Sequence, residues 1–484
     1  MQHTLAFDLG GSSLRLAIVA ADGRFVAFVR KPLSIQSADG VVFDVDPMVW
    51  WRAFVDGCKE LAAVGHDLAA VTAIAGCGFT RTQVFLDGSG RAVRSAIPFQ
   101  DSRSASLLKD MRANAPEEVR QVIERLGPYE PLSRILWLKQ NEPDNWAELR
   151  KVVEPKDFLN LMLTGVAVSD TISQAPMVRA LGDSRDDVLN ALGINRHILP
   201  DTYSPFAPVG QVRKGLPEPL SRLAGVPVHC GSIDTWSCVL GSGALVPGLA
   251  YSISGTSDVS GVISDAAHAA QGLLTVEWGA GIWQLGGPSQ GAATRLQWAL
   301  DRFCPEAPTA QKLEAAVTAA GETPLFLPYL DGERTPWWDP NLRGAFLGLS
   351  TSHHGEDFVR AVAEGMNYLS REILSRAEQA NGVRVEHVSF SGGLATSPAV
   401  CQLKADVLDR PVFVPGNSET GLMGAALIPA SGDPMVSRTQ PVKGTFYRPD
   451  PTRRRYHDDR FAIFQSASAI NAEISHQLAG LARR

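Results

Sequence analysis

A glycine-rich turn near the N-terminus limits the folds that this chain can adopt. The stretch FDLGGSSLR occupies residues 7–15, and short apolar runs flank its Gly-Gly-Ser-Ser turn on both sides. Residues 14–19 alternate with a period near two, which is typical of a β-strand. The turn is therefore predicted to join strand to strand. A Rossmann fingerprint and a P-loop both require a helix after the glycine loop, so both are excluded.

A tight turn between strands can still bind an anion, because consecutive backbone N–H groups form a concave set of donors. The alternative is a hairpin whose glycines only satisfy turn geometry. The dipeptide Asp22-Gly23 predicts a second hairpin turn, and residues 25–29 are predicted as a third strand.

A second turn of the same kind follows about half a chain later. In the stretch LAYSISGTSDVSGVI, residues 249–263, a strand over 250–253 precedes a Gly-Thr-Ser turn and a strand over 259–263 follows it. Two similar units at this separation indicate a duplicated domain, with phosphates bound between the halves. The alternative is coincidence, since turns of Gly, Ser and Thr are common.

The rest of the chain alternates strands with helices, which predicts an α/β protein throughout. Strands are expected at residues 71–75, 226–230, 388–390 and 412–414, and helices at 117–125, 399–408 and from 419. Residues 388–408 have the order strand, Gly-Gly, helix, so that a helix N-terminus would offer N–H groups to a phosphate or a ribose. Two Pro/Gly-rich stretches, residues 214–227 and 431–455, are predicted as surface connections.

Length and composition exclude several classes of protein. The chain of 484 residues suffices for two or three domains, and 45% hydrophobic with 20% charged residues is typical of a globular protein. A net charge of −6 with one short basic run argues against nucleic-acid binding. We expect a cytoplasmic location, since neither a secretory signal nor a membrane-spanning stretch is visible. The six cysteines lack C-x-x-C pairs, which favours reduced thiols over disulfides or zinc.

Asp234 is a candidate for acid–base chemistry. It follows a predicted strand and precedes a predicted helix in the stretch GSIDTWS. One interpretation is an N-cap aspartate. The other is a base that takes a proton from a substrate hydroxyl during phosphoryl transfer.

Together these motifs resemble the FGGY family of carbohydrate kinases over nearly the whole chain. One family signature is matched by YEPLSRILWLKQN, residues 129–141, although Arg134 stands where the family usually has Lys. A second is matched by GAFLGLSTSHHGEDFVRAVAE, residues 344–364, with Ala363 in place of a larger apolar residue. The stretches FLPYLDGERTPWWDP and EPKDFLNLMLTG are most similar to the xylulokinase branch.

The resemblance implies two actin/hexokinase-like (ribonuclease H-like) domains with an ATP/sugar cleft between them. Residues 1–244 would carry the sugar pocket, the first phosphate loop and the catalytic Asp, and residues 245–484 the second phosphate loop and the adenosine site. The implied activity is ATP-dependent phosphorylation of a hydroxyl of a small sugar or polyol, with Mg²⁺. A ketopentose such as D-xylulose is the substrate expected first. Glycerol, a tetritol, ribulose, a deoxyketose and a sugar acid such as gluconate stay open.

The resemblance also implies roles for single residues. Asp8 would hold Mg-ATP, and Asp234 would be the catalytic base. The residues expected to bind ATP are Gly10, Gly11, Ser12, Ser13, Arg15, Gly255, Thr256, Ser257, Gly392 and Gly393. Asp258 stands where the family usually has Gly, and a carboxylate beside a triphosphate is unfavourable unless it faces away or reaches Mg²⁺.

The expected sugar pocket consists of Thr80, Arg81, Asp101 and Asp234. Residues 79–82 take the place of Gln-Met-His-Gly in the xylulokinase branch, so the Met-His pair that contacts xylulose there is absent. An arginine is a rigid fork of five donors and does not substitute simply for histidine. The alternative is a surface arginine. Trp50 is expected either in the sugar wall or in the core.

Two other classes of protein stay open. One is a catalytically silent sugar sensor of the same fold, against which the presence of Asp8 and Asp234 argues. The other is a chaperone-like or actin-like ATPase without a small acceptor, against which the two family signatures argue. The expected partner is a small-molecule sugar or polyol, with no nucleic acid and no membrane; a homodimer stays open.

Overall fold

The computed structural model describes residues 3–34, 40–255, 257–306, 309–318, 321–431 and 441–481. Its contacts divide the chain into two compact units. Unit 1 comprises Met1–Ser237 and Gly421–Ser437, and unit 2 comprises Cys238–Thr420 and Arg438–Arg484. The boundary expected between residues 244 and 245 remains a prediction, and a late segment of the chain belongs to unit 1.

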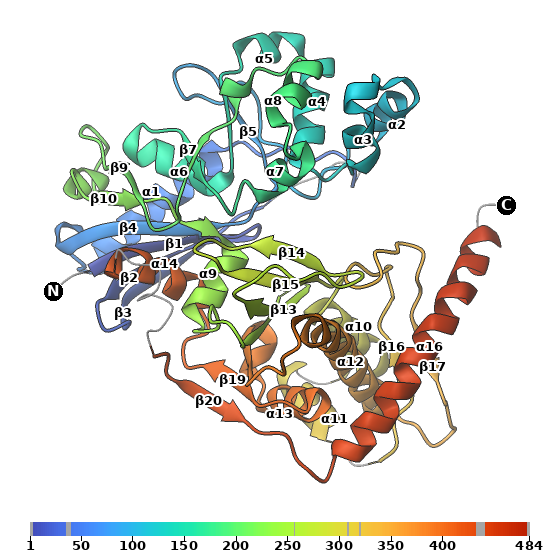
Figure 1. The fold of residues 1–484 in the computed structure, drawn as a ribbon. Helices are drawn as coiled ribbons and strands as arrows, with labels where there is room; N and C mark the ends of the chain where they lie inside the picture. Colours follow the sequence, from blue (N-terminus) through green and yellow to red (C-terminus); the bar gives the residue numbers. More distant parts are fainter. Residues whose placement is uncertain are drawn as a thin grey trace. The chain divides into compact units, whose positions relative to one another are not determined.

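Unit 1 is built on a mixed sheet with the strand order β3-β2-β1-β4-β10-β9, and β11 also pairs with β4 (Figure 1). The strands are β1 (His3–Leu9), β2 (Ser13–Ala20), β3 (Phe25–Pro32), β4 (Val71–Gly78), β9 (Pro208–Gln211), β10 (Pro227–His229) and β11 (Ser232–Ile233). Strands β1, β2 and β3 are antiparallel neighbours, whereas β4, β10 and β11 run parallel to β1. The predicted strand–turn–strand order at the N-terminus is confirmed.

Unit 2 repeats this arrangement in the sheet order β14-β15-β13-β12-β18-β19-β20. The strands are β12 (Ala250–Ser254), β13 (Asp258–Ser264), β14 (Leu274–Glu277), β15 (Trp283–Pro288), β18 (Val388–Gly392), β19 (Val412–Pro415) and β20 (Gly444–Tyr447). As in unit 1, an antiparallel meander is followed by a parallel strand, because β12 pairs antiparallel with β13 and parallel with β18. The order agrees with the predicted duplication.

Both faces of the unit 1 sheet are covered by helices. Helix α1 (Met48–Ala63) packs Trp50 and Phe54 into the core that contains Phe7. On another face, α14 (Thr420–Ser431) places Leu422, Ala425 and Ala426 against Ala6, Ala17 and Val19. The small residues of α14 allow this close approach.

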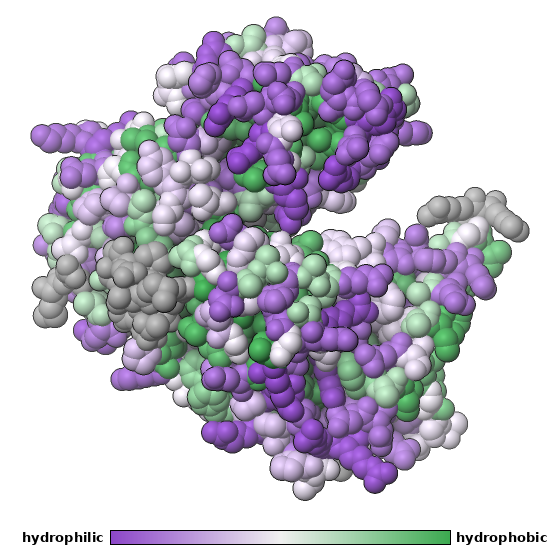
Figure 2. All heavy atoms as spheres, viewed as in Figure 1, coloured by the Kyte–Doolittle hydropathy of each residue, from purple (hydrophilic) through white to green (hydrophobic). Residues whose placement is uncertain are grey.

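A helical group within unit 1 has a core of its own and lies apart from the β1–β4 strands in Figure 1. Its helices are α2 (Ala105–Asn114), α3 (Glu117–Arg125), α4 (Pro131–Asn141), α5 (Pro143–Glu148), α7 (Ala175–Leu181) and α8 (Arg185–Ala191). Their outer surface is mostly hydrophilic (Figure 2). The predicted helix over 117–125 is confirmed with the same bounds. Helix α6 (Pro155–Thr164) contacts β4, and the short strand pairs are β5 (Val84–Leu86) with β6 (Lys151–Val153) and β7 (Val168–Asp170) with β8 (Asp201–Tyr203).

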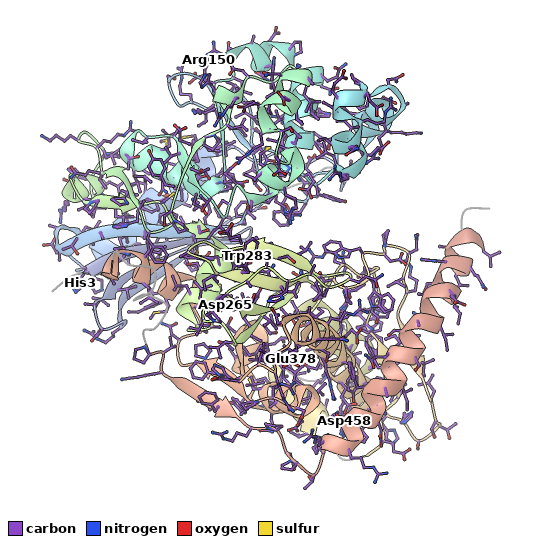
Figure 3. The ribbon with its side chains drawn as sticks, viewed as in Figure 1. His3, Arg150, Asp265, Trp283, Glu378 and Asp458 are labelled. Atoms are coloured by element: carbon purple, nitrogen blue, oxygen red, sulfur yellow. The ribbon has the colours of Figure 1, made fainter. Side chains whose placement is uncertain are left out.

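Unit 2 packs its sheet against α12 (Gly355–Asn381), a helix of 27 residues. Its other helices are α10 (Ala293–Phe303), α11 (Thr309–Thr318), α13 (Pro398–Leu408) and α16 (Arg454–Leu481), and α9 (Asp234–Gly241) crosses the unit boundary. Strands β16 (Leu325–Leu327) and β17 (Ala345–Leu347) form a separate pair. Ion pairs of Glu378 with Arg410 and of Asp458 with Arg371 tie α12 to the C-terminal part of the chain; Figure 3 labels both acids.

The two stretches expected as surface connections also contribute to the core and to a sheet. Residues 214–227 were expected at the surface, but Leu216, Leu220 and Leu223 are buried in the unit 1 core. Their apolar side chains outweigh the turn-forming prolines around them. The stretch 431–455 contains β20, which pairs with β19, while residues 432–440 lie outside the described residues. No helix among the described residues is both long and apolar enough to span a bilayer.

Candidate active site

Three parallel strands of unit 1 end at the same edge of its sheet, and two carboxylates lie there. Leu9 of β1 and Ile233 of β11 are both paired with Gly78 of β4. Asp8 precedes Leu9, and Asp234 follows Ile233. The carboxyl edge of such a sheet is where α/β proteins place their ligands. The pairing therefore brings Asp8 and Asp234, which are far apart in the sequence, to one site.

A glycine before β11 makes this placement possible. Gly231 has a φ of 70°, and a Cβ atom added to it would lie 1.8 Å from the carbonyl oxygen of Gly76. Only a residue without a side chain fits here. One residue later, the Ser232 hydroxyl donates to Asp170 Oδ1 at 2.7 Å, which fixes the start of the strand that leads to Asp234.

The surroundings of Asp234 suit a base that works near neutral pH. Asp234 is the first residue of α9, is half-buried, and accepts hydrogen bonds from the Thr235 backbone N–H at 2.6 Å and its hydroxyl at 3.2 Å. Burial, and then the negative charge of Asp8, raises the pKa of Asp234 to about 6. The N-cap and catalytic interpretations are compatible, since one carboxylate serves both. A carboxylate with this pKa is ionised at pH 7 yet accepts a proton readily.

The first turn has the predicted hairpin geometry. Gly10 N–H donates to the Ser13 carbonyl at 2.9 Å and closes the turn between β1 and β2. Asp8 is paired with Arg15 across the strands, and Arg15 Nη1 donates to Asp8 Oδ2 at 2.9 Å. Asp8 is only 4% exposed. Binding of phosphate by Gly10, Gly11, Ser12, Ser13 and Arg15 remains a prediction.

The second turn is closed in a similar way within unit 2. Ser254 and Asp258 are paired across β12 and β13, and Gly255 N–H donates to the Ser257 carbonyl at 2.9 Å. Thr256, which is expected to bind phosphate, lies outside the described residues. The recurrence of a closed hairpin turn at the corresponding place in the second sheet supports a common role for the two turns.

The expected adenosine loop lies beside this second turn. Gly392 is paired with Ser254 at the ends of β18 and β12. It has a φ of 94°, and a Cβ atom there would lie 2.3 Å from the Ser254 carbonyl oxygen. Gly393 begins a short 3₁₀ turn that precedes α13, and the helix predicted over 399–408 is confirmed as Pro398–Leu408.

The segment that carries Thr80, Arg81 and Thr82 follows the end of β4. Arg81 has a φ of 59°, its side chain is 35% exposed, and Arg81 Nη1 lies 3.9 Å from Glu130 Oε1. The Thr80 hydroxyl is buried and has no hydrogen-bond partner among the described residues. An unpaired buried hydroxyl is costly, and a hydroxyl of a bound sugar would satisfy it.

Arg134 supports the segment that carries Thr80, Arg81 and Thr82. It is fully buried, and its Nη1 donates to the Arg81 carbonyl at 2.9 Å. Further donations reach Gln83 Oε1 and the carbonyl oxygens of Tyr129, Phe99 and Asp101. The family usually has Lys here. The two terminal nitrogens of an arginine supply these bonds with a fixed geometry that an ammonium lacks.

Asp101 and Trp50, the two other residues considered for the sugar pocket, both contact neighbouring residues of unit 1. The Asp101 carboxylate is fully buried and accepts hydrogen bonds from Phe43 N–H at 2.6 Å and from Arg103 Nε at 2.9 Å. Contact of Asp101 with a substrate remains a prediction. Trp50 is 1% exposed and packs edge to face on Phe79, with a centroid distance of 5.8 Å, so it belongs to the core.

The EPKD stretch, residues 154–157, has a structural role that its similarity to the family did not indicate. Glu154 Oε2 accepts the Thr82 N–H at 3.0 Å and thereby supports the segment that carries Arg81. Burial raises the pKa of Glu154 to about 8. Lys156 is 1% exposed and pairs with Asp157 and Asp170, and Asp170 in turn accepts from Ser232. The available signal was three charged side chains within four residues at the start of a helix.

Comparisons with known proteins place this geometry in a family. Residues 3–241 match the model of the N-terminal domain of the FGGY family of carbohydrate kinases, and residues 250–432 match its C-terminal domain. The xylulose kinase of Lactococcus lactis subsp. lactis is 25% identical over 500 residues, covering 99% of each chain. The xylulose kinase of Escherichia coli is 28% identical over 437 residues, covering 87% of this chain and 88% of that protein.

A solved structure has the same fold. The ligand-bound xylulose kinase from Lactobacillus acidophilus superimposes with a TM-score of 0.86 at 20% identity, covering 99% of this chain and 100% of that one. The expected fold class, two actin/hexokinase-like domains, is thereby confirmed.

Proposed function

We propose a residue-level mechanism for this chain, which belongs to the FGGY family of carbohydrate kinases and is an ATP-dependent phosphotransferase with an alcohol group as acceptor. The observation that carries the mechanism is the pair of carboxylates Asp8 and Asp234 at the ends of neighbouring strands. The two carboxylates have different surroundings, which suits them to different tasks. Asp8 is paired with Arg15, whereas the pKa of Asp234 is raised to about 6.

In this mechanism Asp234 is the catalytic base. It accepts the proton of the substrate hydroxyl while the hydroxyl oxygen bonds to the γ-phosphorus of ATP. The bond from that phosphorus to the oxygen bridging to the β-phosphate breaks, and ADP leaves. The protein forms no covalent bond with the substrate in this reaction. Its contribution to catalysis is therefore mainly to orient the hydroxyl and to stabilise the phosphate charge.

Mg²⁺ fits the donor set at this edge of unit 1. The Asp8 carboxylate offers the hard oxygen ligands that Mg²⁺ prefers. We assign Asp8 as the residue that would hold Mg-ATP, and the ion would supply positive charge to the phosphates. The backbone N–H groups of the first turn would bind phosphate oxygens.

We assign nucleotide binding in unit 2 to two loops, which follow β12 and β18. The turn Gly255–Ser257, including Thr256, would bind phosphate, and Gly392 with Gly393 would contact the adenosine. This assignment is supported by the repeat of the sheet order in the two units and by the pairing of Ser254 with Gly392. A cytoplasmic location and a homodimer remain predictions from the sequence.

D-xylulose is the first substrate to test, because the similar proteins named above are xylulose kinases. Thr80 and Arg81 would contact the sugar, and Asp101 would support the pocket. Arg81 adds a cation that the xylulokinase branch lacks. We therefore propose that a compound with an additional acceptor at that end, such as a sugar acid, is phosphorylated better than D-xylulose.

The test is ADP release measured with a panel of ketoses, polyols and sugar acids, for the wild type and for Asp234→Asn. We expect ADP release that depends on one class of acceptor, and a loss of about 10²–10⁴ in kcat for the variant with both ligands still bound. ATP hydrolysis that no acceptor stimulates would favour an actin-like ATPase. Sugar binding without any turnover would favour a silent sensor.

A further inference from the structure

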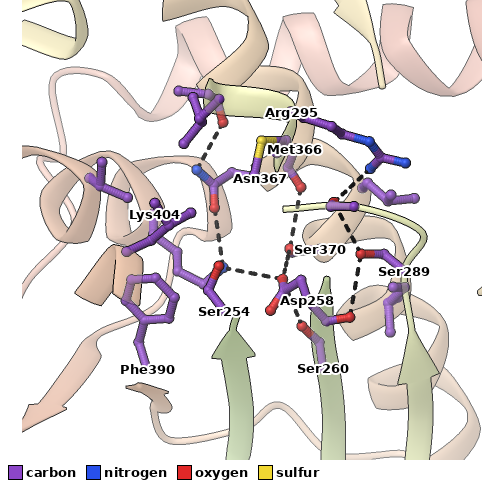
Figure 4. A pocket seen from close by; sticks show the side chains of 17 residues that line it. Ser254, Asp258, Ser260, Ser289, Arg295, Met366, Asn367, Ser370, Phe390 and Lys404 are labelled. Carbon is purple, nitrogen blue, oxygen red and sulfur yellow. Dashed lines mark hydrogen bonds and ion pairs between the residues drawn. The ribbon is translucent and has the colours of Figure 1, made fainter. Parts of the chain in front are cut away.

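Asp258, the residue that departs from the family's usual glycine, has its carboxylate inside unit 2 (Figure 4). Ser252 Oγ donates to Asp258 Oδ1 at 3.0 Å. Ser260 and Ser370 donate to Oδ2 at 3.3 and 3.1 Å. Ser252 and Ser260 are paired across β12 and β13, so both lie on the face of the sheet to which Asp258 also points. Both carboxylate oxygens are thus engaged by buried hydroxyls.

Lys404 of α13 supplies the positive charge that balances this carboxylate. Its Nζ lies 3.9 Å from Asp258 Oδ2, and the two side chains are only 4% and 12% exposed. The ammonium also donates to Asn367 Oδ1 at 3.2 Å and lies 4.7 Å from the centre of the Phe390 ring. Among the described residues Asp258 is the only acid within ion-pair distance of Lys404. Burial lowers the pKa of Lys404, and the negative charge of Asp258 counteracts this shift.

The pair connects the two candidate ATP loops of unit 2. Asp258 directly follows the turn Gly255–Ser257. Lys404 lies in the helix that comes after Gly392 and Gly393. A shift of α13 or of the turn would separate a buried charge from its partner, which is strongly unfavourable.

These contacts argue against direct binding of Mg²⁺ by Asp258. A metal ligand must turn an oxygen lone pair towards the ion, whereas Asp258 accepts from three serine hydroxyls and faces an ammonium.

We propose that Asp258 and Lys404 are positioning residues that act as one unit and hold the second phosphate loop against the Gly392–Gly393 loop, so that both are set for ATP. The inference rests on the proposed function, since it takes these loops to contact the nucleotide. The pair acts through the loops and touches neither the sugar nor the transferred phosphoryl group.

The first measurement is the kinetics of Asp258→Gly, which installs the usual residue of the family. We expect KM for ATP to rise about tenfold, because Lys404 is left buried with only an amide oxygen and an aromatic ring. We expect kcat and KM for the sugar to change less than about twofold, since Asp234 and its surroundings belong to unit 1.

The second measurement is rescue. In Asp258→Gly/Lys404→Met both charges are gone and a flexible apolar chain fills the space, so KM for ATP should return to within about threefold of the wild type. A double-mutant cycle with Lys404→Met should give effects that are far from additive. A matched control is Arg410→Met, which breaks the ion pair with Glu378 elsewhere in unit 2. It should lower the unfolding temperature without changing KM for ATP.

Three results would overturn the proposal. These are additive effects of the two substitutions, an unchanged KM for ATP in Asp258→Gly, or a double variant that needs far more Mg²⁺ than the wild type. If the wild type phosphorylates no acceptor, the proposed function fails instead. The same cycle measured by thermal unfolding then still shows whether the two residues act as a pair.

Discussion

Asp8 raises the pKa of Asp234, and after burial its negative charge is the largest cause of the shift to about 6. The rate should depend on pH accordingly. A base must be ionised to accept a proton, so kcat/KM should rise about tenfold per pH unit below pH 6 and level off above it. Asp8→Asn removes one negative charge and should move this limb to lower pH. A pH profile of both proteins measures the shift, and a limb that stays in place would contradict the coupling.

Asp234→Asn should be more stable than the wild type at pH 8. Folding raises the pKa of Asp234 from its ordinary 3.8 to about 6, so the ionised side chain costs stability above pH 6. The cost falls as the pH drops from 6 to 3.8, and it vanishes only well below 3.8, where the carboxyl is protonated in both states. Since Asp234 is only half-buried, we expect a gain of ~1 kcal/mol in the free energy of unfolding, below the full value of the shift. Urea unfolding at pH 8 and pH 4.5 tests the sign.

Asp8→Ala should weaken Mg-ATP binding far more than sugar binding. Asp8 pairs with Arg15 next to the first turn, so its loss removes a ligand for the ion and one ion-pair partner of the arginine. Calorimetry with each ligand separates the two effects. Asp22→Ala, at the exposed turn between β2 and β3, is the matched control and should change neither affinity. Equal losses for both ligands in Asp8→Ala would indicate a damaged fold instead.

Arg81 should decide which acceptor is preferred. Arg81→Ala should lower kcat/KM for the best acceptor about tenfold or more and leave KM for ATP unchanged, because a charged hydrogen bond to substrate is lost. Arg81→His should shift the preference back towards D-xylulose. Arg91→Ala removes an arginine that is 81% exposed on the same unit and serves as the control. The idea fails if D-xylulose heads the panel by a wide margin, or if Arg81→Ala leaves every acceptor unaffected.

Arg134→Lys should destabilise unit 1 although it restores the family's usual residue. The guanidinium donates to five oxygens around the segment that carries Arg81, and an ammonium reaches fewer of them. We expect a loss of about 2 kcal/mol and a raised KM for the acceptor, with KM for ATP unchanged. Thermal unfolding and kinetics check both parts. An unchanged acceptor KM would show that Arg134 only supports the core.

The sequence predicted those parts of the fold that depend on local patterns. The hairpin turns after Asp8 and after Ser254 follow from alternating apolar residues around glycines, and the helix from Glu117 to Arg125 follows from its period. The parallel pairing of β1, β4 and β11 was not accessible from residue types. It brings Asp8 and Asp234 together because Leu9 and Ile233 both pair with Gly78. The absence of a side chain at Gly231 makes this pairing possible.

The supporting contacts could not be predicted because their partners are distant in the chain. Glu154 supports Thr82 across 72 positions, and the residues of neither stretch identify the other as its partner. Asp258 was recognised as unusual, but its partner Lys404 looks like any lysine on a helix. Leu220 was assigned to a surface connection because prolines surround it, whereas the core of unit 1 has room for its side chain.

Unit 1 includes the late segment Gly421–Ser437, so it cannot be completed until most of the chain has been synthesised. A ribosome releases the chain from its N-terminus, so Ala6, Ala17 and Val19 emerge long before Leu422, Ala425 and Ala426, which cover them. Until then one face of the first sheet stays apolar and open to other chains. A newly synthesised N-terminal half therefore needs protection, by a chaperone or by rapid elongation, and a chain that stops before residue 421 would be prone to aggregate.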